Sequence, residues 1–428
     1  MSLLLIVSLF LFTLAIGMPI SFSIAVSAVA GIIHGSYPLT MVSVRMFQGV
    51  DSFPLMAIPF FVLAGEIMTH GKITQGLVQF SSIFVGRARG GLAQANILVS
   101  MLFAGITGSA TADTTCIGSI LIPAMREEGY PSEFSAAVTA ASSVIGPIIP
   151  PSLVMVLYAL AAGRISIAGL FLAGYVPGIM IGLGLMLVSY MISRKRNYPK
   201  RTEKYTLRQI LTITKNCARA LLMPVIIIGG ILSGAFTPTE AAAVAVAYAF
   251  VICIFVLKTL KLTELAPIFM TTAKVSAVVF LLCATTNILS WILTLHNVPQ
   301  FIFGFFSTIS DNPFVFLLFI NVILLFVGTF IDTVPALFLM VPILKPVADS
   351  FHIHPLHFGV LVTVNLLIGL ITPPVGTCLF VASSIAKITL EKLMVEIWPF
   401  LLVEIVVLFL ITYFPGLVLF VPKIFGYA

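Results

Sequence analysis

The segment FAGITGSATADTT, residues 103–115, gathers hydroxyl side chains, glycines and one carboxylate inside a chain that is otherwise rich in apolar residues. A bilayer core holds no water to hydrogen-bond an irregular backbone, so such a segment persists only where protein buries it or where it lines a cavity. Hydroxyl and carbonyl oxygens are the ligands that hard cations prefer. The segment therefore predicts a cation or substrate site at membrane depth.

A partial copy of this pattern lies in the second half of the chain. Asp-Thr followed by Pro occupies 113–123 and again 332–342, an offset of 219 positions (332 − 113), which Pro19 and Pro238 share. Downstream, GPIIPP at 146–151 and GLITPP at 369–374 share the pattern GxIxPP. Interrupted apolar segments at matching places in two halves are the pattern that points to a transporter's binding site.

Each half is expected to pair a hairpin tip with a helix broken by prolines, and each pair to form one cation site. Proline removes a backbone donor and leaves carbonyls unpaired, and the C-terminal ends of half-helices favour cations while their N-terminal ends favour anions. The candidate sodium ligands are Ser109, Thr111, Asp113, Ile145, Pro147, Gly328, Asp332, Thr333, Gly369 and Thr372. An anionic substrate would lie between the tips, with Thr107, Gly108, Ser109, Thr329 and Thr377 as its candidate contacts.

Two roles remain open for Asp113 and Asp332. Ionisable residues at membrane depth are functional by default. A carboxylate can equally cap a half-helix by accepting backbone N–H groups, without binding an ion. The pattern HxHxxH at 352–357 could bind a metal, but the first half has no counterpart, and this segment is interpreted as a loop.

Composition defines the class of protein. Of 428 residues, 60% are hydrophobic and 9% are charged, against about 25% charged in soluble domains. The net charge of +7 reflects a basic stretch at 194–215 rather than a nucleic-acid surface, and this stretch is a cytoplasmic anchor under the positive-inside rule. Five scattered cysteines are interpreted as small buried residues. The chain is predicted to be an all-α polytopic membrane protein of the lipid bilayer, with no nucleic-acid partner.

The expected organisation is an inverted repeat. Residues 1–193 form the first repeat, 194–215 the basic cytoplasmic loop, and 216–428 the second repeat. Each repeat holds scaffold spans, an interfacial arm, a re-entrant hairpin and a broken helix. The hairpins are expected at 90–126 and 313–346, the broken helices at 133–161 and 356–386, and the arms at 38–52 and 258–270. Because the first repeat crosses the membrane an odd number of times, the second starts from the opposite face.

Four stretches carry a family resemblance: residues 89–130, 142–152, 328–348 and 365–380. They resemble the large membrane subunit of TRAP (tripartite ATP-independent periplasmic) transporters, and the resemblance covers essentially the whole chain. It implies a multi-pass protein of the bacterial inner membrane that works with a small membrane subunit and a periplasmic solute-binding protein. It further implies coupling to two or more sodium ions, no organic cofactor, and an elevator mechanism in which hairpins and broken helices move as a block.

The substrate implied by the resemblance is an organic anion. The chain, including PFFVLAGEIMTHGKI from Pro59, looks closest to the sialic acid (N-acetylneuraminate) branch. The alternative is import of a C4-dicarboxylate or another carboxylate. An intramembrane aspartyl enzyme is a distant alternative that lacks the motifs of that class, and a channel is a further one. The chain is predicted not to be an enzyme.

Overall fold

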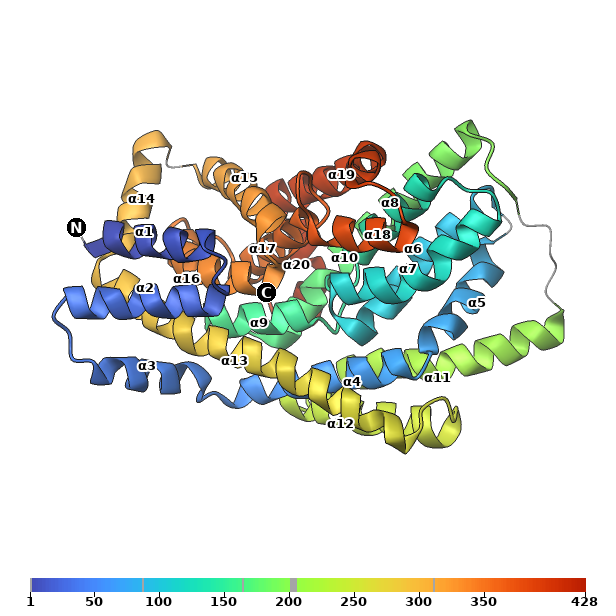
Figure 1. Cartoon of the computed structure of the whole chain (residues 1–428), viewed down its shortest axis with the longest axis horizontal. Helices are drawn as coiled ribbons and strands as arrows, with labels where there is room; N and C mark the ends of the chain where they lie inside the picture. The colour runs from blue at the N-terminus through green and yellow to red at the C-terminus, as the bar shows by residue number, and fades with distance from the viewer. Residues whose placement is uncertain (1, 87, 164, 201–205, 311) are drawn as a thin grey trace.

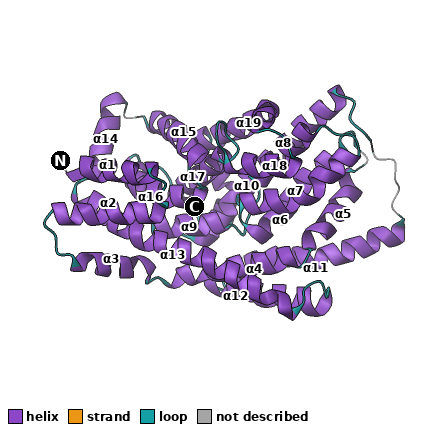
Figure 2. Ribbon diagram, viewed as in Figure 1, coloured by secondary structure: helices purple, strands orange, loops and turns teal. Residues whose placement is uncertain are grey.

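The computed structural model describes residues 2–86, 88–163, 165–200, 206–310 and 312–428. The side chains of residues 2, 3, 106, 107, 207, 212, 216 and 220 also lie outside this description. The basic residues Arg87, Arg201 and Lys204 fall in the gaps. The described residues form helices and no β-strand, apart from an isolated bridge between Arg89 and Lys200 (Figure 2). Eight described helices are long and apolar enough to cross a membrane, which confirms the all-helical polytopic fold.

Helices of the first half follow the expected order. They are α1 Ser2–Ala15, α2 Ile20–His34, α3 Thr40–Val50, the short helix η1 Phe53–Met56, α4 Ala57–His70, α5 Ile73–Val85, α6 Gly91–Thr107, α7 Ala110–Glu127, α8 Ser132–Ser143, α9 Leu153–Ala162 and α10 Ile167–Lys195. The hairpin predicted at 90–126 is α6 and α7. The broken helix predicted at 133–161 is α8 and α9, with turns between them.

The second half repeats this order. It comprises α11 Leu207–Leu232, α12 Pro238–Phe250, the π-helical turn η2 Val251–Val256, η3 Leu262–Glu264, α13 Leu265–Leu295, α14 Val298–Ile309, α15 Pro313–Phe330, α16 Thr333–Ser350, α17 Pro355–Gly369, α18 Thr377–Ala386, α19 Leu390–Tyr413 and α20 Pro415–Ile424. Helices α15 and α16 form the second hairpin, and α17 and α18 the second broken helix.

Several elements differ from those expected from the sequence. Helices α5 and α14 precede the two hairpins and were not predicted. The second arm, expected at 258–270, is wrong as a separate element, because α13 runs unbroken from Leu265 to Leu295. Residues 51–56, which include η1, separate α3 from α4, whereas the only proline of α13, Pro267, lies in its first turn, where proline is tolerated.

The basic segment is shorter than predicted. Helix α10 ends at Lys195 and α11 begins at Leu207, so Arg208 and Lys215 belong to α11 rather than to a loop at 194–215. Asn197 in this connection accepts a hydrogen bond of 2.8 Å from the Arg89 guanidinium at the base of the first hairpin. The base of the hairpin and the basic connection therefore lie on the same side of the molecule.

The two hairpins enter the fold from opposite ends. In Figure 1, α6 and α7 lie toward the right, where α11 begins, while α15 and α16 lie toward the left beside α14. Helix α13 crosses below them and packs against α2, α3 and α4 on one side and against α16 on the other. The helices thus form two groups that contact each other: α1 to α4 with α11 to α13, and the hairpins with the broken helices.

Polar side chains join each hairpin to its broken helix. In the first half, Asn96 of α6 donates to Thr139 of α8 over 2.7 Å. In the second half, Asn365 of α17 donates to Asn321 of α15 over 2.8 Å, and Asn321 donates to Thr412 of α19 over 2.9 Å. Such hydrogen bonds between membrane helices add modestly to the close packing of α6 on α8 and of α15 on α17, which joins each hairpin to its broken helix.

Candidate functional site

The tip of the first hairpin is a turn between two helices. Gly108 ends α6 with φ +61°, and Ser109 is the N-cap of α7, its hydroxyl accepting from the backbone N–H of Ala112 over 3.4 Å. The same hydroxyl lies 3.2 Å from that of Thr111. Serine is a preferred N-cap residue because its side chain accepts one of the unpaired N–H groups at a helix start. The tip therefore brings two hydroxyl oxygens to the N-terminus of α7.

Asp113 lies one turn further into α7 and is fully buried. Its carboxylate lies against the break between α8 and α9, because a Cβ placed on Gly146 would be 2.5 Å from its Oδ2. Beside it, the Thr114 hydroxyl donates to Ser143 of α8 over 2.7 Å. Asp113 thus joins the first hairpin to the first broken helix at a point where only glycine fits.

The tip of the second hairpin has a related but distinct structure. Asp332 occupies the N-cap position of α16, and the buried hydroxyl of Thr333 has no hydrogen-bond partner among the described residues. Gly328 of α15 crosses Gly369 of α17 in backbone contact, since a Cβ on Gly369 would lie 2.5 Å from the carbonyl carbon of Gly328. The carbonyl of Thr329 accepts from the N–H of Gly376 over 3.1 Å, which ties the tip to the second break.

The structure corrects the correspondence between the two aspartates. The N-caps Ser109 and Asp332 are 223 positions apart (332 − 109), as are the GxIxPP motifs (369 − 146). Under this offset Asp113 has no acidic counterpart, and the 219-position match of the two aspartates does not align their helices. The difference of four residues is about one helical turn. Asp113 therefore lies inside α7, whereas Asp332 precedes α16 as its N-cap. The peptide bonds Pro150–Pro151 and Pro373–Pro374, also 223 positions apart, are both cis.

A cavity of about 470 Å³ lies between the two tips. Ser109 and Thr111 line it from the first tip, Asp332 and Thr333 from the second, and Pro147 from the first break. Gly108, which was predicted as a substrate contact, also lines it. The predicted site is thus one space shared by both halves, large enough for a small organic ion.

Other predicted residues lie outside the lining. The Thr372 hydroxyl donates to Ile368 over 2.8 Å, and the carbonyl of Gly369 accepts from Thr372 N–H over 3.0 Å. The carbonyl of Ile145, an expected sodium ligand, accepts hydrogen bonds from the backbone N–H groups of Ile148 and Ile149. This oxygen is therefore already engaged within the turn. Thr329 and Thr377 do not line the cavity, although the Thr377 hydroxyl has no partner among the described residues. Thr107 ends α6, but its side chain lies outside the described part.

The sequence reasoning missed Lys274. This residue of α13 lines the cavity opposite the tips and is the one cation among the described lining residues, as Asp332 is the one anion. A lysine nine residues after the start of an apolar helix of 31 residues is a signal that could have identified it, because an ionisable residue inside a span is costly and marks a functional site. The cavity therefore offers a positive charge on one wall and oxygen ligands on the other.

The histidines at 352–357 do not form a metal centre. His354 is the N-cap of α17, and His357 contacts the carbonyl of Ile411 through Nε2 at 2.8 Å. Within the described ranges, no group of three or more His, Cys, Asp or Glu side chains is arranged to hold a metal ion.

Among solved structures, transporters share this fold. The structure of the YdaH transporter of Alcanivorax borkumensis superposes with a TM-score of 0.66 over 90% of this chain and 89% of that one, at 13% sequence identity. At this identity the likeness shows the arrangement of helices alone.

Sequence relatives cover nearly the whole chain. It is 43% identical to the protein YgiK of Salmonella typhimurium (97% of this chain, 96% of that one) and 42% identical to the sialic acid TRAP transporter large permease protein SiaM of Vibrio cholerae (96% of each). It is 37% identical to the C4-dicarboxylate TRAP transporter large permease protein DctM of Rhodobacter capsulatus over the full length of both.

SiaM and DctM are named as transporter permeases, which confirms the predictions that the chain is not an enzyme and that it lies in the inner membrane, and argues against the aspartyl-enzyme alternative. The protein-family model for the DctM component of tripartite ATP-independent periplasmic transporters matches residues 6–417 of this chain. The chain therefore belongs to the DctM family, the large membrane permeases of TRAP transporters.

Proposed function

We propose that this permease couples the inward movement of sodium ions to the import of an organic anion, which a periplasmic solute-binding protein delivers and a small membrane subunit helps to transport. The observation that supports this proposal is the shared cavity, where both hairpin tips and the first helix break meet opposite Lys274. An anionic substrate fits between a lysine and helix N-termini, since both favour negative charge.

Oxygen ligands for sodium are present at both tips. The Ser109 and Thr111 hydroxyls and the Asp113 carboxylate would hold an ion in the first half, and the Asp332 carboxylate and the unpartnered Thr333 hydroxyl would hold one in the second. Carboxylate, hydroxyl and carbonyl oxygens match the preference of a hard cation. A bound cation also offsets the repulsion between an anionic substrate and a neighbouring aspartate, which couples the binding of the two.

Alternating access would come from movement of the hairpins with their broken helices past α13 and the helices packed behind it. The hydrogen bonds Asn96–Thr139 and Asn321–Asn365 favour movement of each hairpin together with its broken helix, and packing of α18 against α7 and α8 and of α16 against α9 joins the two halves. We place the basic connection after α10 and the base of the first hairpin in the cytoplasm, and both termini in the periplasm.

Sialic acid is the proposed substrate, because a relative named for sialic acid is 42% identical to this chain, whereas one named for C4-dicarboxylates is 37% identical. Import of a C4-dicarboxylate or another carboxylate is the alternative.

Uptake by proteoliposomes that contain both membrane subunits, with the binding protein added outside, tests the proposal. An inward sodium gradient is expected to drive accumulation of labelled N-acetylneuraminate, and unlabelled N-acetylneuraminate is expected to compete better than succinate. Accumulation that is unchanged when potassium replaces sodium would contradict sodium coupling. In the same assay, Thr333→Val is expected to raise the sodium concentration for half-maximal uptake, whereas Thr294→Val, an exposed position of α13, should not.

A further inference from the structure

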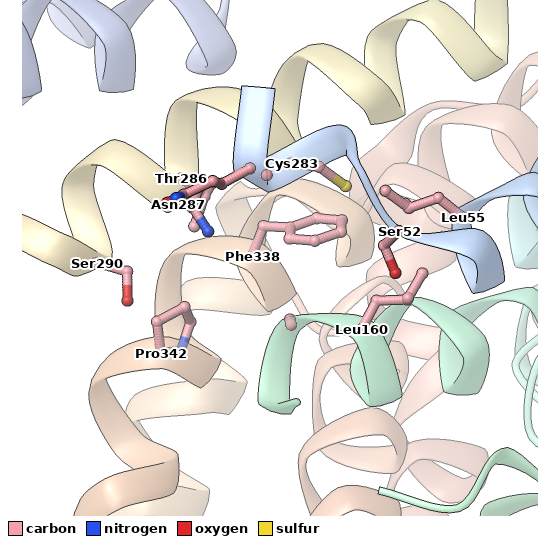
Figure 3. Close-up of a pocket in the computed structure, with 12 residues that line it drawn as sticks. Ser52, Leu55, Leu160, Cys283, Thr286, Asn287, Ser290, Phe338 and Pro342 are labelled. Atoms are coloured by element: carbon pink, nitrogen blue, oxygen red, sulfur yellow. The ribbon is translucent and has the colours of Figure 1, made fainter. Parts of the chain in front are cut away.

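A second cavity, of about 170 Å³, lies further along α13 and is lined by both polar and apolar residues (Figure 3). We call it the polar cavity, after the hydroxyl and amide side chains on one of its sides. Thr286, Asn287 and Ser290 face it from α13, and Gln48 and Ser52 face it from α3 and the turn that follows. The opposite wall is formed by Leu160 of α9 and by Phe338 and Pro342 of α16. The side formed by α3, η1 and α13 therefore carries all the hydroxyl and amide side chains of the lining, beside Leu55 and Cys283, and the side that belongs to the hairpin and the broken helix is apolar.

Both cavities lie on one track along the same three helices. Val154 of α9, Val334 of α16 and Leu282 of α13 line the first cavity, and residues further toward the C-terminal end of each helix line the second. From Lys274 to Ser290 the track spans sixteen residues (290 − 274), or about 24 Å at about 1.5 Å per residue. This length approaches the ~30 Å thickness of a bilayer core.

The far end of the track carries a second cation. The Arg45 guanidinium lies 5.0 Å from the ring centroid of Trp291, the residue after Ser290, and donates to the Gln48 side chain over 3.3 Å. Trp291 packs edge-on against Tyr37, with ring centroids 5.4 Å apart. The aromatic ring and the glutamine thus hold a positive charge at the edge of the polar cavity, about one helical turn before Gly49, which also lines it.

We propose that this polar cavity is the periplasmic docking site of the substrate track, where the polar groups of an organic anion contact α3 and α13 while the hairpins face the periplasm. The inference rests on the proposed function, because it takes α3 and the end of α13 to be periplasmic. In Figure 1, α3 lies at the left, away from the start of α11 at the right, where the basic connection ends.

Movement of the hairpins along α13 would carry the tips from the Lys274 end of the track to the Ser290 end. The substrate would then leave Lys274, and Arg45 would take over as the nearest positive charge. Asn287 and Ser290 offer donors and acceptors suited to hydroxyl and amide groups of the substrate, and Arg45 attracts its carboxylate. Lys274 of α13 and Arg45 of α3 thus place one positive charge at each end of the substrate's path.

Transport assays with matched variants test this role. Asn287→Leu and Ser290→Ala are expected to reduce initial N-acetylneuraminate uptake roughly two- to tenfold, the range that the loss of one hydrogen bond gives. Thr294→Val, an equivalent loss of a hydroxyl one turn beyond the cavity, should keep the wild-type rate. Arg45→Gln is expected to reduce uptake and Arg45→Lys to restore most of it, because Lys retains the charge.

Trp291 provides a readout independent of transport. The chain holds two tryptophans, and Trp398 is half exposed, so a Trp398→Phe variant leaves Trp291 as the reporter beside the cavity. Binding protein loaded with N-acetylneuraminate is expected to change the Trp291 fluorescence of the assembled transporter in sodium more than unloaded binding protein does. The Trp291→Phe variant defines the background signal.

The inference is overturned if Asn287→Leu, Ser290→Ala and Arg45→Gln all transport like Thr294→Val, or if loaded and unloaded binding protein give the same Trp291 signal. Failure of the proposed function gives a different result, namely no sodium-driven uptake by the wild-type transporter. The fluorescence difference still decides whether the substrate reaches the polar cavity in that case.

Discussion

At the scale of residues, Lys274 gives the cavity its charge. It lines the space between the tips without an anionic partner of its own on α13, and the hairpins bring Asp332 to the same space. Opposite charges attract, so Lys274 would draw an anionic substrate toward this side of the cavity. The sequence did not reveal this role, because Lys274 lies close to the expected interfacial arm, where lysines act as topology anchors.

Replacement of this charge is expected to impair substrate binding rather than folding. Lys274→Gln should reduce uptake of the anion at low concentrations of loaded binding protein by about tenfold or more, and Lys274→Arg should retain much of it. Lys258→Gln, at an exposed position before α13, is the matched control and should transport normally. Normal uptake by Lys274→Gln would show that the substrate carboxylate is held elsewhere.

At the scale of elements, the sequence predicted the parts that build the site. Glycines and hydroxyl residues marked both tips, and prolines marked both breaks, because these residue types remove or replace helical hydrogen bonds. Helices α5 and α14, of 13 and 12 residues, were missed, since a short apolar helix between longer ones has no signal of its own. The unbroken course of α13 was missed because the charged residues just before it, Lys258, Lys261 and Glu264, resemble part of an interfacial helix.

The crossing of α15 and α17 depends on two glycines. A methyl group on Gly369 would lie 2.5 Å from the backbone of Gly328, so the helices would have to separate. Gly369→Ala is expected to cost about 1–3 kcal/mol, the usual effect of overpacking, and to lower both the thermal midpoint and uptake. Gly76→Ala provides the control, because a Cβ there meets nothing within 4 Å and Ala favours a helix. Equal thermal midpoints for the two variants would contradict the close crossing.

At the scale of the whole molecule, the inverted repeat explains why one cavity has tips from both sides. The offset of 223 positions aligns the tips and the proline breaks, but the remainder of the halves has diverged: α3 is separate from α4, whereas α13 is continuous. Helix α13 is unbroken over 31 residues. It could therefore act as a fixed surface along which the hairpins slide. The shared motifs predicted the repeat. The asymmetry was missed although residues 268–295 contain no Pro or Gly that would break a helix, because the charges before α13 had been assigned to an interfacial arm.

Movement of the hairpins along α13 can be tested by crosslinking a hairpin to this helix. Cys283 of α13 and Phe338 of α16 line the same polar cavity, so a Phe338→Cys variant, with the other four native cysteines replaced, places two thiols within reach of a short bifunctional reagent. If the hairpins move past α13, this crosslink should stop uptake and leave sodium binding intact, and a reducible linker should restore uptake on cleavage. The variant with Cys283 also replaced controls for modification of a single thiol. Uptake at the full rate through a verified crosslink would mean that α16 does not move relative to α13, and access to the site would then have to change by opening of the hairpin tips alone.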